Sequence, residues 1–248
     1  MPIALPDMPQ TEAAIMQMTN AFRAENRLGA VVPSARLQTA AKAFADYLAR
    51  SGAFAHTADG RQPAERATAA GYQYCIVAEN LAMHQSNRGF ETVDLAQRAV
   101  EGWKNSPPHR ANLLQPHVTE TGIGIARSGD TNPKFLTVQL FGRPSSFKYS
   151  IAIENISGAA VSYLIDDQKN TIADAMHVTH TACVPHELTF DIGKVTSKYQ
   201  ARDGETFVIA RGPDGKVHVD LEKPKPSSAA TPSAATSSLV SARSSKAR

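Results

Sequence analysis

The sequence predicts an α+β protein with two structured parts and an irregular C-terminal end. Over residues 11–142, apolar residues first recur every three to four positions, as in helices, and then alternate in two short strands. Over residues 147–221 the helical period is lost, and short alternating stretches between turns predict an all-β, sandwich-like unit. The expected segments are an N-terminal arm (1–10), a first domain (11–144), an all-β domain (145–221) and a disordered, basic Pro/Ser/Ala-rich tail (222–248).

The helices of the first domain have recognisable ends. Residues 11–27 predict one helix, and a second follows Ser34, a candidate N-cap, and stops at Gly52. Pro63 opens a short helix, since proline is tolerated in a first turn. Further helices are expected from Thr92 to the prolines at 107 and 108, and over residues 109–114. Residues 72–82 are apolar and irregular, which fits either a strand or an ordered loop.

The strands are short and separated by turn residues. In the first domain, residues 122–127 and 134–142 predict a hairpin whose connection reads SGDTNP. In the all-β domain, Pro213-Asp214-Gly215-Lys216 forms a turn, because proline fixes φ and glycine accepts a positive φ. The strands expected in this domain lie at residues 147–153, 161–165, 188–192, 206–210 and 217–221.

Composition and charge exclude several classes of function. The chain has 248 residues, 42% of them hydrophobic, which is enough for a core. The net charge of +3 is concentrated in residues 222–248, where five basic residues stand against one acid, so the body is nearly neutral and no nucleic-acid partner is expected. No apolar run approaches the ~18 residues of a transmembrane segment. The first residues lack the charged and apolar regions of a signal peptide.

The common catalytic motifs are missing from the sequence. We find no GxSxG elbow, Walker A loop, complete GxGxxG fingerprint, HExxH or CxxC. No nucleophile and base can be paired from the sequence. A binding or interaction role is therefore favoured over an enzyme.

Three stretches together carry a resemblance to a known family. They read FAHTADG at 54–60, AENLA at 78–82 and KNSPPHRANLLQPHVTETGIGIA following Trp103, and a strand FLTVQLFG comes after them. In this order they resemble the CAP superfamily, the SCP-like proteins that include cysteine-rich secretory, venom-antigen and pathogenesis-related proteins, and most of all its small bacterial members. The resemblance covers about residues 11–142 and implies an α-β-α sandwich with a central cleft.

The resemblance also implies site residues. The cleft of many members holds two histidines and two acids, in some around a divalent metal. The first histidine falls on His56, the first acid on Glu79 and the second histidine on His109. The position of the second acid is occupied by Ser106. Glu101 lies before Trp103, on the other side, and Glu120, just before the GIGIA strand, is the candidate that could replace the missing acid.

The chemistry of these residues leaves several roles open. Two imidazoles and a carboxylate leave free positions on a tetrahedral zinc, so zinc or another divalent metal is the cofactor that the resemblance allows. Neutral imidazole is also a good general base near pH 7, which admits a metal-dependent hydrolase. The same cluster can instead pin two elements together by hydrogen bonds. A lipid or sterol carrier is a further alternative.

The family resemblance sets the expected location and partners. It implies a periplasmic or extracellular protein that binds an envelope ligand, a protein partner or a small apolar ligand. In an exported protein, Cys75 and Cys183 can be oxidised, and we expect them to form one disulfide between the two domains. His177, His180 and His186 surround Cys183, and an exposed loop stapled by this disulfide is favoured there over a soft-metal site.

Overall fold

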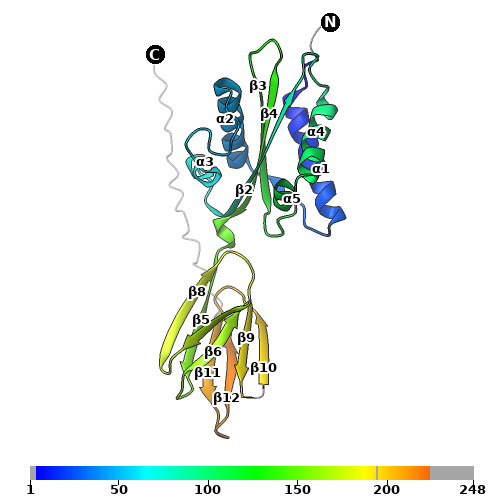
Figure 1. Cartoon of the computed structure of the whole chain (residues 1–248). Coiled ribbons are helices and arrows are strands. Elements are labelled where there is room, and N and C mark those ends of the chain that lie inside the picture. Colours follow the sequence, from blue (N-terminus) through cyan, green and yellow to red (C-terminus); the bar gives the residue numbers. More distant parts are fainter. Residues whose placement is uncertain (1–3, 194, 224–248) are drawn as a thin grey trace, which may run out of the picture.

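The computed structural model describes residues 4–193 and 195–223, which form two layered domains in succession along the chain (Figure 1). Of the predicted tail, residues 224–248 lie outside the described residues. In the part of the chain that is described, no helix is long and apolar enough to cross a membrane.

The first domain contains five helices and a four-stranded sheet. In chain order its elements are α1 (Met8–Glu25), β1 (Val32–Pro33), α2 (Ala35–Ser51), α3 (Pro63–Ala69), β2 (Tyr74–Gln85), α4 (Thr92–Lys104), α5 (Pro107–Leu113), β3 (Glu120–Arg127) and β4 (Lys134–Pro144). The sheet order is β1-β3-β4-β2, so β2 is an edge strand. Helices α2 and α3 lie on one side of the sheet, and α1, α4 and α5 lie on the other (Figure 1). This is the predicted α-β-α sandwich.

Alternation along β4 separates two cores. Leu136, Val138 and Leu140 pack against α2, whereas Phe135 and Phe141 face α1 and α4. Helix α2 can lie directly on β3 because Gly122 and Gly124 leave room for it. A Cβ at Gly122 would come within 2.1 Å of the Gln38 backbone nitrogen, and one at Gly124 within 2.3 Å of the Lys42 nitrogen.

Several elements differ from the sequence prediction, among them α1 and the segment at residues 72–82. Helix α1 begins at Met8, inside the expected N-terminal arm, because Asp7 caps it: its side chain accepts a hydrogen bond from the Gln10 backbone at 2.9 Å. The segment that fits either a strand or a loop is strand β2. It pairs with β4 along eleven aligned positions, from Tyr74 opposite Pro144 to Gln85 opposite Lys134.

The second domain is a β-sandwich of two four-stranded sheets. Its strands are β5 (Tyr149–Ile156), β6 (Val161–Ile165), β7 (Gln168–Ile172), β8 (Met176–Ala182), β9 (Glu187–Ile192), β10 (Val195–Gln200), β11 (Thr206–Arg211) and β12 (Val217–Glu222). One sheet has the order β10-β9-β6-β7 and the other β12-β11-β5-β8. Between them lies one apolar core that contains Tyr163, Phe190 and Phe207.

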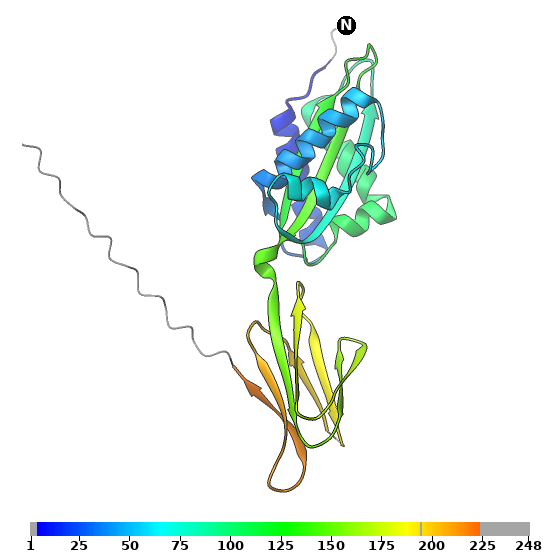
Figure 2. The same ribbon diagram turned by 90° about the vertical axis from the view of Figure 1, so that its left-hand side faces the viewer.

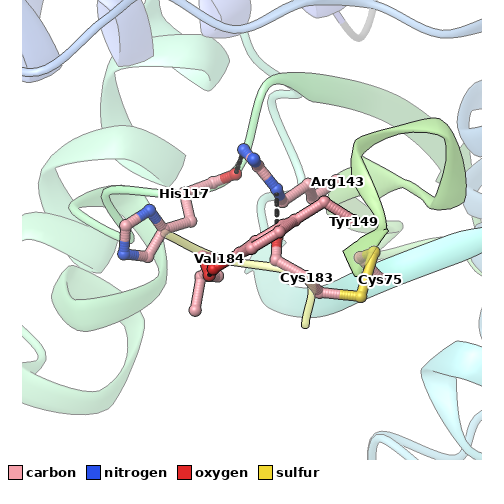
Figure 3. Close-up of a disulfide and its surroundings, with 6 residues drawn as sticks. All are labelled: Cys75, His117, Arg143, Tyr149, Cys183 and Val184. Atoms are coloured by element: carbon pink, nitrogen blue, oxygen red, sulfur yellow. Dashed lines mark hydrogen bonds between the residues drawn. A yellow bond between two sulfur atoms is a disulfide. The ribbon is translucent and has the colours of Figure 1, made fainter. Parts of the chain in front are cut away.

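A short junction connects the two domains (Figure 2). Strand β4 leads through a single 3₁₀ turn, η1 (Ser145–Phe147), directly into β5. Beside it, Cys75 of β2 and Cys183, which follows β8, form a disulfide with a Cα–Cα distance of 5.4 Å, as predicted (Figure 3).

Polar contacts support this disulfide. Arg143 Nε donates to the Cys183 carbonyl at 2.6 Å, and Arg143 Nη1 donates to the His117 carbonyl at 3.1 Å (Figure 3). The Tyr149 hydroxyl donates to the Val184 carbonyl at 3.0 Å. The junction is thus fixed by one covalent bond and by hydrogen bonds from the last residues of β4 and the first of β5.

Candidate functional site

The first predicted histidine, His56, lies in a well-ordered loop after α2. Gly52 ends the helix with a φ of 71°, in the left-handed region that glycine adopts without strain. The Tyr47 hydroxyl then donates to the Ala58 carbonyl at 2.8 Å, which ties the loop back to α2. A short loop tied at its base can hold one side chain in a fixed direction.

The first predicted acid, Glu79, lies in the middle of β2 and contacts that histidine directly. His56 Nδ1 is 2.8 Å from Glu79 Oε1. The Glu79 side chain is 1% exposed and the His56 side chain 50% exposed, so a buried carboxylate holds an imidazole at the surface. If the neutral ring donates Nδ1–H to Glu79, its lone pair is on Nε2, at the outward end.

A residue that the sequence prediction missed, Arg66 of α3, completes this arrangement. Its Nη2 donates to Glu79 Oε2 at 2.7 Å and to the His56 carbonyl at 2.9 Å. Its Nη1 donates to Asp59 Oδ1 and to the Arg61 carbonyl, both at 2.8 Å. A buried carboxylate requires a compensating charge, and the guanidinium provides it while fixing the loop. In the sequence, the one sign of this role is an arginine among the mostly small residues of the segment PAERATA.

The second predicted histidine, His109, comes from the other side of the sheet. It lies in the first turn of α5, after Pro107 and Pro108, and its Nδ1 is 2.9 Å from Ser106 Oγ. Burial lowers the pKa of His109, and electrostatic repulsion between its protonated form and nearby His56 lowers it further. His109 is therefore neutral near pH 7 and can either accept or donate a hydrogen bond.

Two asparagines hold α5 against the edge strand. Asn80 Nδ2 donates to the His109 carbonyl at 3.1 Å. Asn112 Nδ2 donates to the Glu79 carbonyl at 3.0 Å and to Asn80 Oδ1 at 2.9 Å. Glu79 is aligned with Leu140 of β4 and Asn80 with Gln139, and as successive residues of a strand their side chains point to opposite faces of the sheet. The site therefore wraps around the outer edge of β2.

A groove of about 300 Å³ extends along this edge. Phe54 and Met83, which are 44% and 42% exposed, give it an apolar surface, and Trp103 forms part of its floor. The indole Nε1 of Trp103 donates to the Leu81 carbonyl at 2.9 Å. Its polar lining residues are His84, Ser106, His109 and Arg98, and Arg98 is paired with Asp94.

The remaining candidate, Glu120, lies elsewhere. It is the first residue of β3, aligned with Gly142, whereas Glu79 lies on β2, and β4 runs between these two strands. Its neighbour is Tyr72, whose pKa is raised by burial and then by the negative charge of Glu120. The structure thus brings together His56 and Glu79, places His109 near them, and separates Glu120 from them.

The donor atoms do not fit a three-ligand zinc site. Both oxygens of Glu79 are engaged, one with His56 and the other with the Arg66 guanidinium at 2.7 Å, which repels a cation. This leaves two imidazoles, one fewer than the three protein ligands of catalytic zinc sites. Among the described residues, no group of three or more His, Cys, Asp or Glu side chains is arranged to hold a metal ion.

The histidines around Cys183 are engaged separately. Cys183 is in the disulfide, His180 Nε2 is 2.6 Å from the Tyr163 hydroxyl, and His186 Nδ1 is 2.5 Å from Asp166 Oδ2. The disulfide that was expected here is present, so the Cys183 sulfur is not a free thiol.

The fold and the site together define a class: an α-β-α sandwich with a His–Glu pair and a second histidine around an edge strand. Residues 16–141 match the model of the CAP family, the cysteine-rich secretory proteins. The chain belongs to the CAP family.

Individual relatives are distant. The uncharacterized protein YkwD of Bacillus subtilis (strain 168) is 27% identical over 119 residues, which cover 48% of this chain and 43% of YkwD. The chain thus spans less than half the length of that relative. An extracellular SCP-domain protein from Bacillus anthracis is 23% identical, with a TM-score of 0.46, over 55% of this chain and 41% of that one. An outer surface protein of Borrelia burgdorferi is 24% identical, with a TM-score of 0.47, over 54% of this chain and 93% of that one.

Proposed function

We propose that this chain is an exported CAP-domain protein that binds a ligand in the groove along β2 without transforming it. The observation that supports this most is the state of Glu79. Both of its oxygens are occupied by His56 and Arg66, so the carboxylate acts as a support that holds an imidazole at the surface.

The lining of the groove indicates the chemistry of the ligand. Phe54 and Met83 provide exposed apolar surface, and the imidazole of His109 can exchange hydrogen bonds with a polar group. A ligand with an apolar body and an uncharged polar end fits this combination, as binding sites are mostly apolar with a few placed polar groups. A lipid or sterol belongs to this class.

A hydrolytic function is less well supported by the geometry. Ser106 Oγ and His109 Nδ1 are 2.9 Å apart, which is the separation of a nucleophile and its base. However, among the described residues no carboxylate contacts the ring of His109. Pro107 and Pro108 also remove two backbone N–H groups that could have formed an oxyanion hole at the start of α5. The metal-dependent alternative conflicts with the ion pair between Arg66 and Glu79.

Export is supported by two observations. The family to which the chain belongs is described as one of secretory proteins. The disulfide between Cys75 and Cys183 belongs to an oxidising compartment, because thiols are kept reduced in the cytosol.

The binding proposal can be tested by extracting the protein from its native compartment with organic solvent and identifying the extract by mass spectrometry. We expect an apolar compound in stoichiometric amount from the wild type and its loss from Met83→Glu, which places a charge in the groove. Val93→Glu is the matched control, because Val93 is 59% exposed and does not line the groove.

Two outcomes would contradict the proposal. One is an extract from the wild type without any bound compound, and the other is equal retention by Met83→Glu and Val93→Glu. Calorimetric titration with zinc separates the hydrolase alternative: tight binding that is lost in His109→Asn would favour a metal site.

A further inference from the structure

A second cavity lies on the other side of the first domain, between α2 and α3. Its volume is about 440 Å³, within the range of small-molecule sites. It shares no lining residue with the groove along β2. The function proposed above does not involve this cavity.

Three arginines and one acid contribute the charges of the cavity. Arg66 and Asp59 pair with each other at 2.8 Å, so their charges are balanced. Arg50, at the end of α2, and Arg61, in the loop before α3, also line the cavity. Within residues 4–193 and 195–223, neither of their side chains forms an ion pair or a hydrogen bond that would neutralise it. The cavity wall therefore carries two uncompensated positive charges.

The position of Arg61 is fixed by its backbone. Its N–H donates to Asp59 Oδ1 at 3.2 Å, and its carbonyl accepts from Arg66 Nη1 at 2.8 Å. These backbone hydrogen bonds fix the point at which the exposed Arg61 side chain leaves the loop beside the cavity.

Apart from Thr39, the remainder of the cavity lining is alanine and aromatic. Alanines line it from both helices, and beneath them the Phe44 and Tyr47 rings lie nearly parallel, with centroids 6.4 Å apart and an interplanar angle of 13°. The Arg66 guanidinium lies over the Phe44 ring at 3.5 Å. The alanines are Ala40 and Ala43 of α2, and Ala69 and Ala70 at the end of α3.

We propose that this cavity binds a small molecule that carries an oxyanion, a carboxylate or a phosphate, on a flat apolar body. The oxyanion lies between Arg50 and Arg61, because guanidinium groups match the planar geometry of these anions. The apolar body lies on the alanines. Arg66 lines this cavity and also binds Glu79, so the occupied cavity is in direct contact with the residue that supports His56.

The test is a titration of the ¹⁵N-labelled full chain with naphthalene-2-carboxylate and with 2-naphthyl phosphate, followed by NMR. We expect saturable shifts of backbone amides in α2 and α3. Arg50→Gln and Arg61→Gln should each raise the dissociation constant about tenfold, since each removes one charged hydrogen-bonding group. Tighter binding of the phosphate identifies a phosphate as the natural group, and tighter binding of the carboxylate a carboxylate.

Controls keep the result interpretable. Arg127→Gln removes an exposed arginine outside the cavity and should leave the affinity unchanged. Ala69→Trp fills the cavity from an exposed position and should abolish binding, and the amide spectrum of each variant reports whether it folds. The proposal is overturned if no saturation occurs up to the solubility limit, if 2-naphthylmethylamine binds as tightly as the carboxylate, or if the shifts occur around His109.

Discussion

Both domains have apolar cores and bury some polar side chains, such as Asn155 and Glu205 in the second domain, but they differ in what holds separate elements together. The CAP domain buries charged and amide side chains where separate elements meet: Arg23, Arg66, Glu79 and Asn80 are each at most 5% exposed. The core of the β-sandwich is built around a cluster of aromatic rings, in which Phe190 and Phe207 lie 5.9 Å apart between their centroids. The candidate site is in the first domain. There, loops and helix ends that are joined by polar contacts hold side chains at the surface, whereas the aromatic side chains of the β-sandwich core are buried.

The largest expected effect concerns the disulfide between Cys75 and Cys183, which joins the two domains. Removing it with Cys75→Ser and Cys183→Ser should lower the free energy of unfolding by about 4–5 kcal/mol in the chain-entropy model, because it closes a long loop. The domains should then unfold separately. Fluorescence of Trp103, the chain's one tryptophan, reports the CAP domain, and far-ultraviolet circular dichroism reports the whole chain. Coincident transitions at the wild-type urea midpoint would contradict this.

A slightly smaller effect is expected at Arg23 of α1. Its guanidinium donates to the carbonyls of Gly29, Leu113 and Gln115 within 3.0 Å and is buried, which lowers its pKa. Arg23→Met should lower the free energy of unfolding by at least about 3 kcal/mol, since each carbonyl that loses its donor costs about 1 kcal/mol or more. Urea unfolding followed by Trp103 fluorescence measures it. The exposed Arg127→Met is the control, and equal midpoints for the two variants would refute the anchoring role.

A change in the β-sandwich should be milder and local. Phe190→Leu keeps most of the buried volume, so we expect a loss of about 1 kcal/mol. In the Cys75→Ser/Cys183→Ser background, where the domains are expected to unfold separately, the circular dichroism midpoint should fall while the Trp103 transition stays in place. If the Trp103 transition moves by as much, the two domains are one cooperative unit and the contrast between them is wrong.

The smallest expected effect compares one histidine from each domain. Burial lowers the pKa of His109 and of His180 below the ordinary value of 6.5. Between the lowered value and 6.5 the unfolded chain binds more protons than the folded one. The contribution of these histidines to the free energy of unfolding is therefore complete above pH 6.5 and declines as the pH falls toward and through their folded-state pKa values.

Histidine side-chain NMR titration and urea unfolding at several pH values test this dependence. His109→Gln should make the unfolding free energy of the CAP domain, as followed by Trp103 fluorescence, depend less on pH. A measured pKa for His109 at or above 6.5 would contradict the expected burial and the closeness of His56.

The elements with strong local signals could be predicted from sequence. The signals at Ser34, Gly52 and Pro107-Pro108 each act within a few residues: α2 begins after Ser34 and ends at Gly52, and α5 begins at Pro107. Strands β7, β8 and β10 were not predicted, because at least half of their residues are polar or exposed and alternation is weak.

The candidate site was partly predictable for a different reason. His56, Glu79 and His109 lie within motifs that the family resemblance aligns, whereas the role of Arg66 depends on how α3 docks on β2. Such a contact between distant elements leaves no periodic signal. The position of Glu120 shows the same limit, since only the strand order reveals that β4 separates it from Glu79.

The disulfide also determines how the chain carries mechanical load. Because Cys75 and Cys183 are bonded, a pull on the two ends is transmitted across the sulfur atoms and bypasses residues 76–182. Glu79 and His109 lie inside this shielded segment, whereas His56 and Arg66 lie outside it. Under tension, the loop that carries His56 would be stretched away from a Glu79 that stays in place, so force alone could separate the two halves of the site.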